Sequence, residues 1–262
     1  MQSRLLLSRV VLTAAVAAVF GSFAHSAIVR EFDASSAGAG VDPSGVTPAW
    51  TRFGTPMTNT GSFLLQDNTA DDPATSSGEY LAPPVPGLMS LASGQYGVEV
   101  RARPLTDVPF LGGSHFGNAY VFWSDDSFAY NITLDKDTDD SGPGTTGGIK
   151  YGQNSMSNAV VGIDWSIPHS IFIGYVGTAP FGNFTFYVDG VSAGVVSAGS
   201  IARTGSFAQN AVDFGDGTTG QGIDVAVEWY RVALHDSAAV PEPATLCGLA
   251  TVGLLAARRR RL

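Results

Sequence analysis

Three aspartates at alternate positions have a spacing that suits metal chemistry. Asp135, Asp137 and Asp139 lie in a Gly- and Thr-rich stretch with too few apolar side chains to form a core. Hard carboxylate oxygens at every second position are the first half of a calcium loop of the form Asp-x-Asp-x-Asp-Gly. The pattern breaks at its sixth position, Asp140, and at its twelfth, Thr146. The break favours a solvated acidic loop, and a bound Ca²⁺ remains the alternative.

Aromatic side chains beside a pair of aspartates suggest a second kind of site. Tyr120, Trp123 and Tyr130 flank Asp125 and its neighbour Asp126. An exposed ring next to a carboxylate can stack on a sugar while the carboxylate binds the sugar hydroxyls. The same rings can belong to the core instead, since Trp and Tyr are buried on average. Tyr120, Trp123, Asp125 and Tyr130 are therefore a candidate ligand-binding site, with core packing as the alternative.

Strands must position these residues, because helical periodicity is nearly absent between residues 27 and 239. Short β-branched and aromatic runs bounded by Gly, Pro, Asn and Asp recur instead. They predict strands at 28–33, 62–66, 96–103, 119–124, 128–134, 170–176, 184–188, 191–196 and 224–235. Loops are predicted at 38–40, 71–78, 82–87 and 135–148. The middle of the chain is therefore predicted to be all-β.

Local patterns orient some of these strands. Over residues 98–103, Val and Ala alternate with Glu and Arg, as in a strand with one buried and one wet face. Residues 171–173 are apolar on both faces, which predicts a central strand. Asp189 and Gly190 separate two apolar runs, and a type I′ turn needs positive φ at both central residues. A β-hairpin is therefore predicted at this pair.

The N-terminus has the layout of an export signal. Arg4 and Arg9 precede an apolar run, and small residues follow at Ala24, Ser26 and Ala27. This order predicts a secretory signal peptide over the first 26 residues, with cleavage after Ser26 or Ala27.

The C-terminus has a second short apolar segment. Pro241, Glu242 and Pro243 precede an apolar run at 244–257. Four arginines close the segment: Arg258, Arg259, Arg260 and Arg261. A 14-residue helix reaches roughly 21 Å, less than the roughly 30 Å core of a bilayer. Because clustered arginines stay cytoplasmic, the end of the chain is predicted to lie inside and everything before Val240 outside.

The Pro-Glu-Pro triplet, the short apolar helix and the terminal arginines together resemble the PEP-CTERM sorting signal of Gram-negative bacteria. A membrane-bound exosortase is thought to recognise and process this signal. The resemblance implies a sorting signal at 240–262 with a short transmembrane helix and a basic tail. It also implies transient attachment to the inner membrane, through this segment only, followed by delivery to the cell surface or extracellular matrix. A plain tail anchor is the alternative.

Removing both ends leaves a strongly acidic domain. The two ends contain six of the 14 Lys and Arg residues and one of the 23 Asp and Glu residues. The remaining 8 basic and 22 acidic residues give a net charge of −14. Such a charge repels nucleic acid and anionic lipid, so neither is an expected partner. The single cysteine, Cys247, lies in the apolar tail, so no disulfide can stabilise the domain.

Three strand patterns suggest a fold family. The octapeptide that begins at Tyr96, the hairpin around Asp189 and the closing run at 225–232 resemble the laminin-G and concanavalin-A-like jelly roll. The resemblance implies a two-sheet antiparallel β-sandwich over residues 27–239. Immunoglobulin-like and fibronectin-like sandwiches are the main alternatives.

No catalytic motif is recognisable. Glycoside hydrolases of the jelly-roll kind place their carboxylates in a Glu-x-Asp-x-Glu pattern, and none of Glu31, Glu79, Glu99 and Glu228 has such neighbours. We therefore expect a noncatalytic protein with a structural or adhesive role and extracellular polysaccharide as a partner. A calcium-dependent carbohydrate-binding module and a polysaccharide-active enzyme without a known motif are the alternatives.

Overall fold

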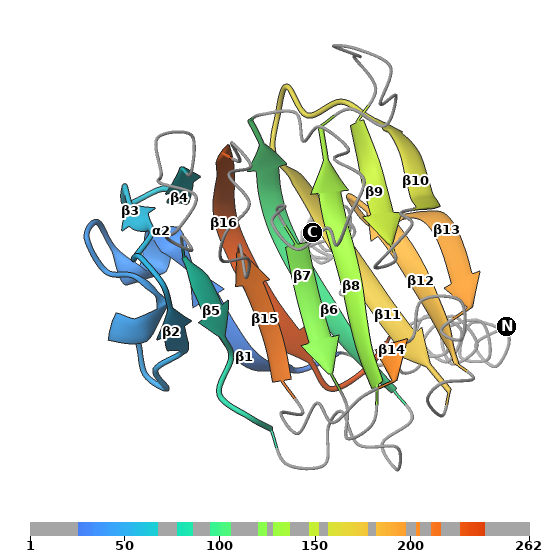
Figure 1. Cartoon of the computed structure of the whole chain (residues 1–262), viewed down its shortest axis with the longest axis horizontal. Helices are drawn as coiled ribbons and strands as arrows, with labels where there is room; N and C mark the ends of the chain where they lie inside the picture. Colours follow the sequence, from blue (N-terminus) through green and yellow to red (C-terminus); the bar gives the residue numbers. More distant parts are fainter. Residues whose placement is uncertain are drawn as a thin grey trace, which may run out of the picture.

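The computed structural model describes residues 26–67, 78–85, 95–105, 120–124, 128–136, 147–151, 157–177, 182–197, 203–204, 211–215 and 226–238. These residues form two antiparallel sheets stacked in two layers (Figure 1). Sheet A comprises β1 (Ile28–Asp33), β3 (Thr58–Asn59), β4 (Leu64–Asp67), β6 (Gln95–Pro104), β11 (His169–Val176), β12 (Asn183–Val188), β13 (Val191–Ser197) and β16 (Ala226–His235). Sheet B comprises β2 (Thr51–Phe53), β5 (Glu79–Leu81), β7 (Tyr120–Ser124), β8 (Phe128–Asp135), β9 (Gly147–Tyr151), β10 (Ser157–Ile163), β14 (Arg203–Thr204) and β15 (Ala211–Gly215).

Two short helical turns complete the described elements. They are α2 (Ala34–Ala37) and the 3₁₀ turn η1 (Pro43–Gly45). Asp33 caps α2 by accepting hydrogen bonds from the Ser36 N–H at 2.9 Å and the Ser35 hydroxyl at 2.7 Å. The architecture is thus the predicted two-sheet antiparallel sandwich, which is also the architecture of a jelly roll.

Strand β16 organises sheet A. One edge of β16 pairs with β6, while the opposite edge pairs with β4 along its first half and with β1 along its second half. The order of the sheet is β13-β12-β11-β6-β16-β4-β3, and that of sheet B is β10-β9-β8-β7-β15-β5-β2. The first and last described strands of the chain are therefore direct neighbours.

Aromatic rings from both sheets fill one part of the core. The Phe214 ring of β15 lies 5.1 Å from the Trp229 ring of β16 and 5.7 Å from the Tyr80 ring of β5. All three side chains are fully buried. The Trp229 indole N–H donates to the Gln66 side-chain oxygen at 2.9 Å, so its polar edge is satisfied inside the sandwich. Burial raises the pKa of the Tyr80 hydroxyl, which stays protonated.

Several local predictions are confirmed. Val98, Val100 and Ala102 are buried, whereas the three charged residues between and after them are not. Residues 171–173 are buried on both faces of β11, which lies between β6 and β12. Asp189 has φ 50° and Gly190 has φ 80°, as the predicted hairpin turn between β12 and β13 requires.

The predicted exposed loop at 135–148 is wrong at both ends. Asp135 is the last residue of β8 and only 2% exposed, and Gly147 begins β9 as a buried residue. A Cβ on Gly147 would lie within van der Waals overlap of the Trp165 ring, so the glycine is there to let that ring pack. A strand that begins with glycine lacks the apolar pattern by which strands are predicted, and the packing of Trp165 against Gly147 cannot be inferred from the sequence. Residues 137–146 lie outside the described part of the chain.

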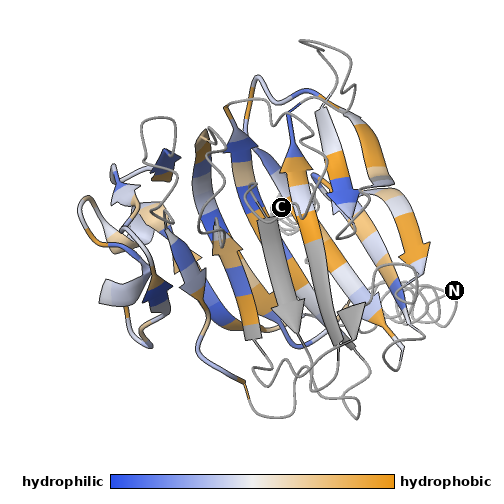
Figure 2. Ribbon diagram, in the orientation of Figure 1, coloured by the Kyte–Doolittle hydropathy of each residue, from blue (hydrophilic) through white to orange (hydrophobic). Residues whose placement is uncertain are grey.

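The two sheets meet along one side of the sandwich. Hydrophobic residues are prominent in β10 and β13, the edge strands of sheets B and A (Figure 2). An ideal Cβ on Gly194 of β13 would lie 2.6 Å from the Ala159 carbonyl of β10, so the backbones touch there. Val161, Val191 and Val195 remain exposed on these edges.

Candidate functional site

The predicted sugar platform lies on two neighbouring strands of sheet B. Tyr120 and Trp123 belong to β7, and Tyr130 belongs to β8. Trp123 pairs with Tyr130 in the strand register, and Tyr120 pairs with Thr133. The side chains of these three residues and the whole of Asp125 are outside what the structure describes. The platform therefore stays a prediction.

The aspartates of the predicted calcium loop are only partly described. The Asp135 carboxylate lies 2.6 Å from the Lys150 ammonium of β9, and both groups are buried. Asp137 and Asp139 lie outside the described residues. Within the described ranges, no three His, Cys, Asp or Glu side chains are close enough to share a metal ion. The Lys150 ammonium group thus occupies the position beside Asp135 that a metal ion would take. Calcium binding stays a prediction.

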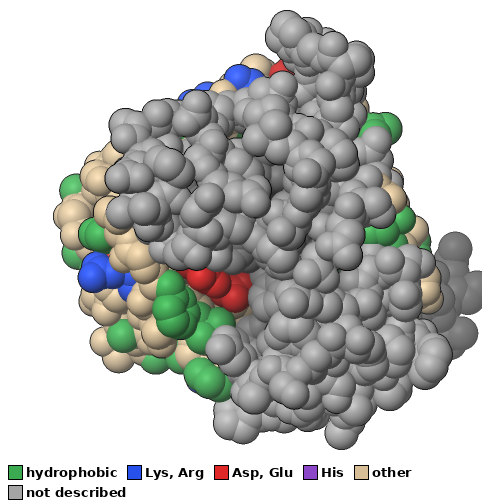
Figure 3. Space-filling view, viewed as in Figure 1, with side chains coloured by type: hydrophobic (Ala, Val, Ile, Leu, Met, Phe, Trp, Pro, Cys, Tyr) green, Lys and Arg blue, Asp and Glu red, His purple; other side chains and the backbone are tan. Residues whose placement is uncertain are grey.

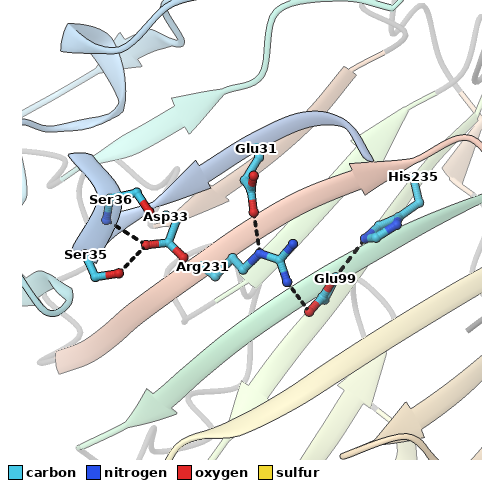
Figure 4. A network of polar contacts seen from close by, with 7 residues as sticks. All are labelled: Glu31, Asp33, Ser35, Ser36, Glu99, Arg231 and His235. Carbon is cyan, nitrogen blue, oxygen red and sulfur yellow. Dashed lines mark hydrogen bonds and ion pairs between the residues drawn. The ribbon is translucent and has the colours of Figure 1, made fainter. Parts of the chain in front are cut away.

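A charged network lies on the outer face of sheet A and joins three strands (Figure 4). Arg231 of β16 lies at its centre and donates to Glu31 of β1 at 2.5 Å and to Glu99 of β6 at 2.8 Å. The second Glu99 oxygen pairs with the His235 imidazole at 3.0 Å. The four residues come from three adjacent strands, so the network ties both edges of β16 to its neighbours.

Strand register explains why these side chains meet. Ala233 of β16 pairs with Glu31 on one side and with Glu99 on the other, so both glutamates lie on the face that Ala233 occupies. The small alanine leaves space between them. A register shift between Trp229 and Arg231 brings the Arg231 side chain onto this face.

The electrostatics of the network keep Glu99 ionised. Burial alone would raise the pKa of Glu99, but the His235 hydrogen bond and the Arg231 charge outweigh it, so the pKa lies below its usual range. His235 is only 1% exposed, and among the described residues its Nδ1 has no hydrogen-bond partner. A general acid for glycoside cleavage needs the opposite shift, a raised pKa.

A second ion pair lies farther along the same strands. Arg103 binds the Glu228 carboxylate through two nitrogens, at 2.7 and 2.8 Å. The Tyr230 hydroxyl donates to the same carboxylate at 2.8 Å, and Arg101 lies over the Tyr230 ring at 5.6 Å. Glu31, Glu99 and Glu228 are therefore each paired with an arginine.

A small group of acidic side chains is also visible on the face of the molecule drawn in Figure 3.

The C-terminal residues match a known sorting motif. A family model described as the PEP-CTERM protein-sorting motif matches residues 239–261. This chain carries an exosortase sorting signal. The motif implies processing by exosortase and an exported, surface-sorted protein, in agreement with the resemblance noted in the sequence. No helix in the described ranges is long and apolar enough to cross a bilayer.

Several solved structures resemble this chain in part, at low sequence identity. An alginate lyase is 10% identical, with a TM-score of 0.45 over 79% of this chain and 97% of that chain. Domain 4 of an extracellular arabinanase from Geobacillus stearothermophilus, in complex with arabinotriose, is 14% identical, with a TM-score of 0.43 over 83% and 96%. An endo-1,3-β-glucanase from Streptomyces sioyaensis is 14% identical, with a TM-score of 0.39 over 82% and 98%. A comparison with curated proteins gives no match.

Sequence reasoning missed the charged network because its members are far apart in the chain. Glu31 and Arg231 are separated by 200 residues, and Glu99 and Arg231 by 132. The alternation at 98–103 did place Glu99 on the outer face. Only the strand order brings Arg231 beside it.

Proposed function

We propose that this exported protein is a noncatalytic component of the cell surface or extracellular matrix, in which the β-sandwich has a structural or adhesive role. Exosortase processing releases the domain from the sorting segment, and the domain then contacts extracellular polysaccharide. The sorting motif supports the location, and the composition of the outer face of sheet A supports the absence of catalysis.

The observation that carries the proposal is the neutralisation of the glutamates. Hydrolysis of a glycosidic bond needs one protonated carboxyl and one free carboxylate on either side of the bond. Glu31 and Glu99 instead converge on one guanidinium, and Glu228 is held by another. The lowered pKa of Glu99 and the fixed arginine partners of all three carboxylates favour a structural role for these side chains. Such a network joins strands and resists rearrangement by a ligand.

The test combines a binding assay with an activity assay on protein isolated from the medium of an exporting host. Co-sedimentation with the polysaccharide of the native matrix measures contact, and reducing-end release measures cleavage. We expect sedimentation with no release of reducing ends. If the wild-type protein releases reducing ends and substitution of a carboxylate abolishes this release, the protein is an enzyme and the proposal is wrong.

A glycan array with and without chelator separates a general adhesive role from a calcium-dependent module. Binding to one glycan class that disappears with chelator would identify the calcium-dependent alternative. Binding that chelator leaves unchanged supports the proposal. D137N, in the predicted calcium loop, is the matched control: if the chelator acts by removing calcium from this loop, the variant should lose the same binding without chelator.

A further inference from the structure

The two ends of the described chain are in direct contact. The Ala27 N–H donates to the Asp236 carboxylate at 2.8 Å, and the Asp236 N–H donates to the Ala27 carbonyl at 3.0 Å. The Ser26 hydroxyl donates to the Ser237 carbonyl at 3.2 Å. Ala27 is exposed at this contact. The predicted signal-peptide junction therefore lies against the segment that leads to the sorting motif.

We call residues 236–238 the exit segment, because the sorting motif begins at residue 239. The exit segment lies across two glycines, Gly97 of β6 and Gly174 of β11, which are partners in the strand register. An ideal Cβ on Gly97 would lie 2.8 Å from the Ser237 carbonyl, and one on Gly174 would lie 2.7 Å from the Ala238 carbonyl. The paired glycines thus let the exit segment lie close to the sheet.

We propose that signal peptidase cleaves the chain after Ser26 and that the new α-ammonium group of Ala27 forms an ion pair with the Asp236 carboxylate. The inference rests on export and not on the adhesive role. Loss of polysaccharide binding would therefore leave it unaffected.

The chemistry is an amide hydrolysis. Water attacks the Ser26 carbonyl carbon, the bond to the Ala27 nitrogen breaks, Ser26 leaves as a carboxylate, and the nitrogen becomes an ammonium. Ala24 and Ser26 supply the small residues that signal peptidase needs at the third and first positions before the cut. The nitrogen already lies 2.8 Å from a carboxylate oxygen, so its new charge forms where the opposite charge is present.

Cleavage one residue later would discard this arrangement. Removal of Ala27 would remove both of its hydrogen bonds to Asp236 and move the charge to Ile28, which pairs with His235 inside sheet A. Cleavage after Ser26 gives up the Ser26 contact to Ser237 but keeps both Ala27 bonds and adds an electrostatic attraction to one of them. N-terminal processing thus places an ion pair at the exit segment, which precedes the sorting motif.

The first measurement is the intact mass and N-terminal sequence of the protein isolated from an exporting host. The proposal expects Ala27 as the first residue. Any other first residue would overturn it, whatever the polysaccharide assays show.

The second measurement tests the ion pair through the reactivity of the α-amine. Acylation needs the neutral amine, and a nearby carboxylate favours the ammonium, so labelling at pH 7 should be about two to five times slower in the wild type than in D236N. The matched control is D164N, which removes an exposed carboxylate near the opposite end of β6 and should label like the wild type. Salt at 1 M should reduce the difference. Equal labelling of the wild type and D236N, or equal acceleration in D164N, would contradict the proposal.

Discussion

Replacing Glu99 with glutamine tests whether the charged network of sheet A stabilises the domain. The substitution keeps the shape of the side chain and removes its charge. The carboxylate contacts Arg231 with one oxygen and His235 with the other, whereas the amide has one accepting oxygen and presents an NH2 group in place of the second. Weakening these two bonds costs about 1–2 kcal/mol in all, since hydrogen bonds to charged groups contribute about 1.5–3 kcal/mol and neutral ones about 0.5–1.5. The Glu99 side chain is 13% exposed, so the total loss is about 1–2 kcal/mol after screening.

The dependence on pH makes this prediction specific. The pKa of Glu99 is lower in the folded protein than its reference value of 4.5, so its stabilisation is present above about pH 4.5. It is lost as the pH falls through the folded pKa. Urea unfolding should therefore show a gap of about 1–2 kcal/mol between the wild type and E99Q at pH 7, which closes toward pH 3. At pH 7 the melting temperature should fall by roughly 2–8 °C.

A matched control lies in the same network. Glu31 is 39% exposed and makes one contact to Arg231, so E31Q should cost less than about 0.5 kcal/mol. A gap for E99Q that is equal at pH 7 and pH 3 would show that the loss comes from packing and not from charge. A gap for E31Q as large as that for E99Q would refute the argument from burial.

Three further perturbations follow from the structure. G97A places a methyl group against the Phe172 ring, with which an ideal Cβ would overlap, and 2.8 Å from the Ser237 carbonyl, and should destabilise the protein by about 1–3 kcal/mol. Thermal unfolding measures this loss, and an unchanged stability would contradict the close packing. His169 pairs with Asp189, and although burial lowers its pKa, this pairing raises the pKa above 6.5 overall. The stability gap between the wild type and H169Q should thus be complete below about pH 6.5 and shrink as the pH rises through the folded pKa; a gap that grows with pH in urea unfolding would show the wrong sign. W229F leaves the buried Gln66 oxygen without its donor and should lower the free energy of unfolding in urea by about 1–3 kcal/mol. An unchanged free energy of unfolding would refute this prediction.

Many strands with alternating or apolar patterns were predicted, but β10 and β15 were missed along with strands that begin with glycine or have only two or three residues. The run at 28–33 coincides with β1, and that at 128–134 falls one residue short of β8. Strand β9 was missed because it begins with two glycines, and β5 has only three residues. A two-residue period cannot be recognised over such lengths.

The site was less predictable than the fold for a geometric reason. Asp135 was placed in a flexible loop because its neighbours are polar, yet Lys150 of the adjacent strand pairs with it. The partners of Glu99 were likewise set by strand order. Local sequence indicated which face a charge occupies, and the identity of its partner depended on pairing between distant segments.

The position of β16 constrains how this protein can fold during export. A chain that crosses a membrane from its N-terminus delivers β1, β4 and β6 long before β16, which pairs with all three. Until the last strand arrives, those three present unpaired backbone edges to the periplasm, where they can associate with other chains. Closure of sheet A therefore waits for the segment next to the sorting signal. Retention of that signal at the membrane would give each molecule time to fold alone before its release.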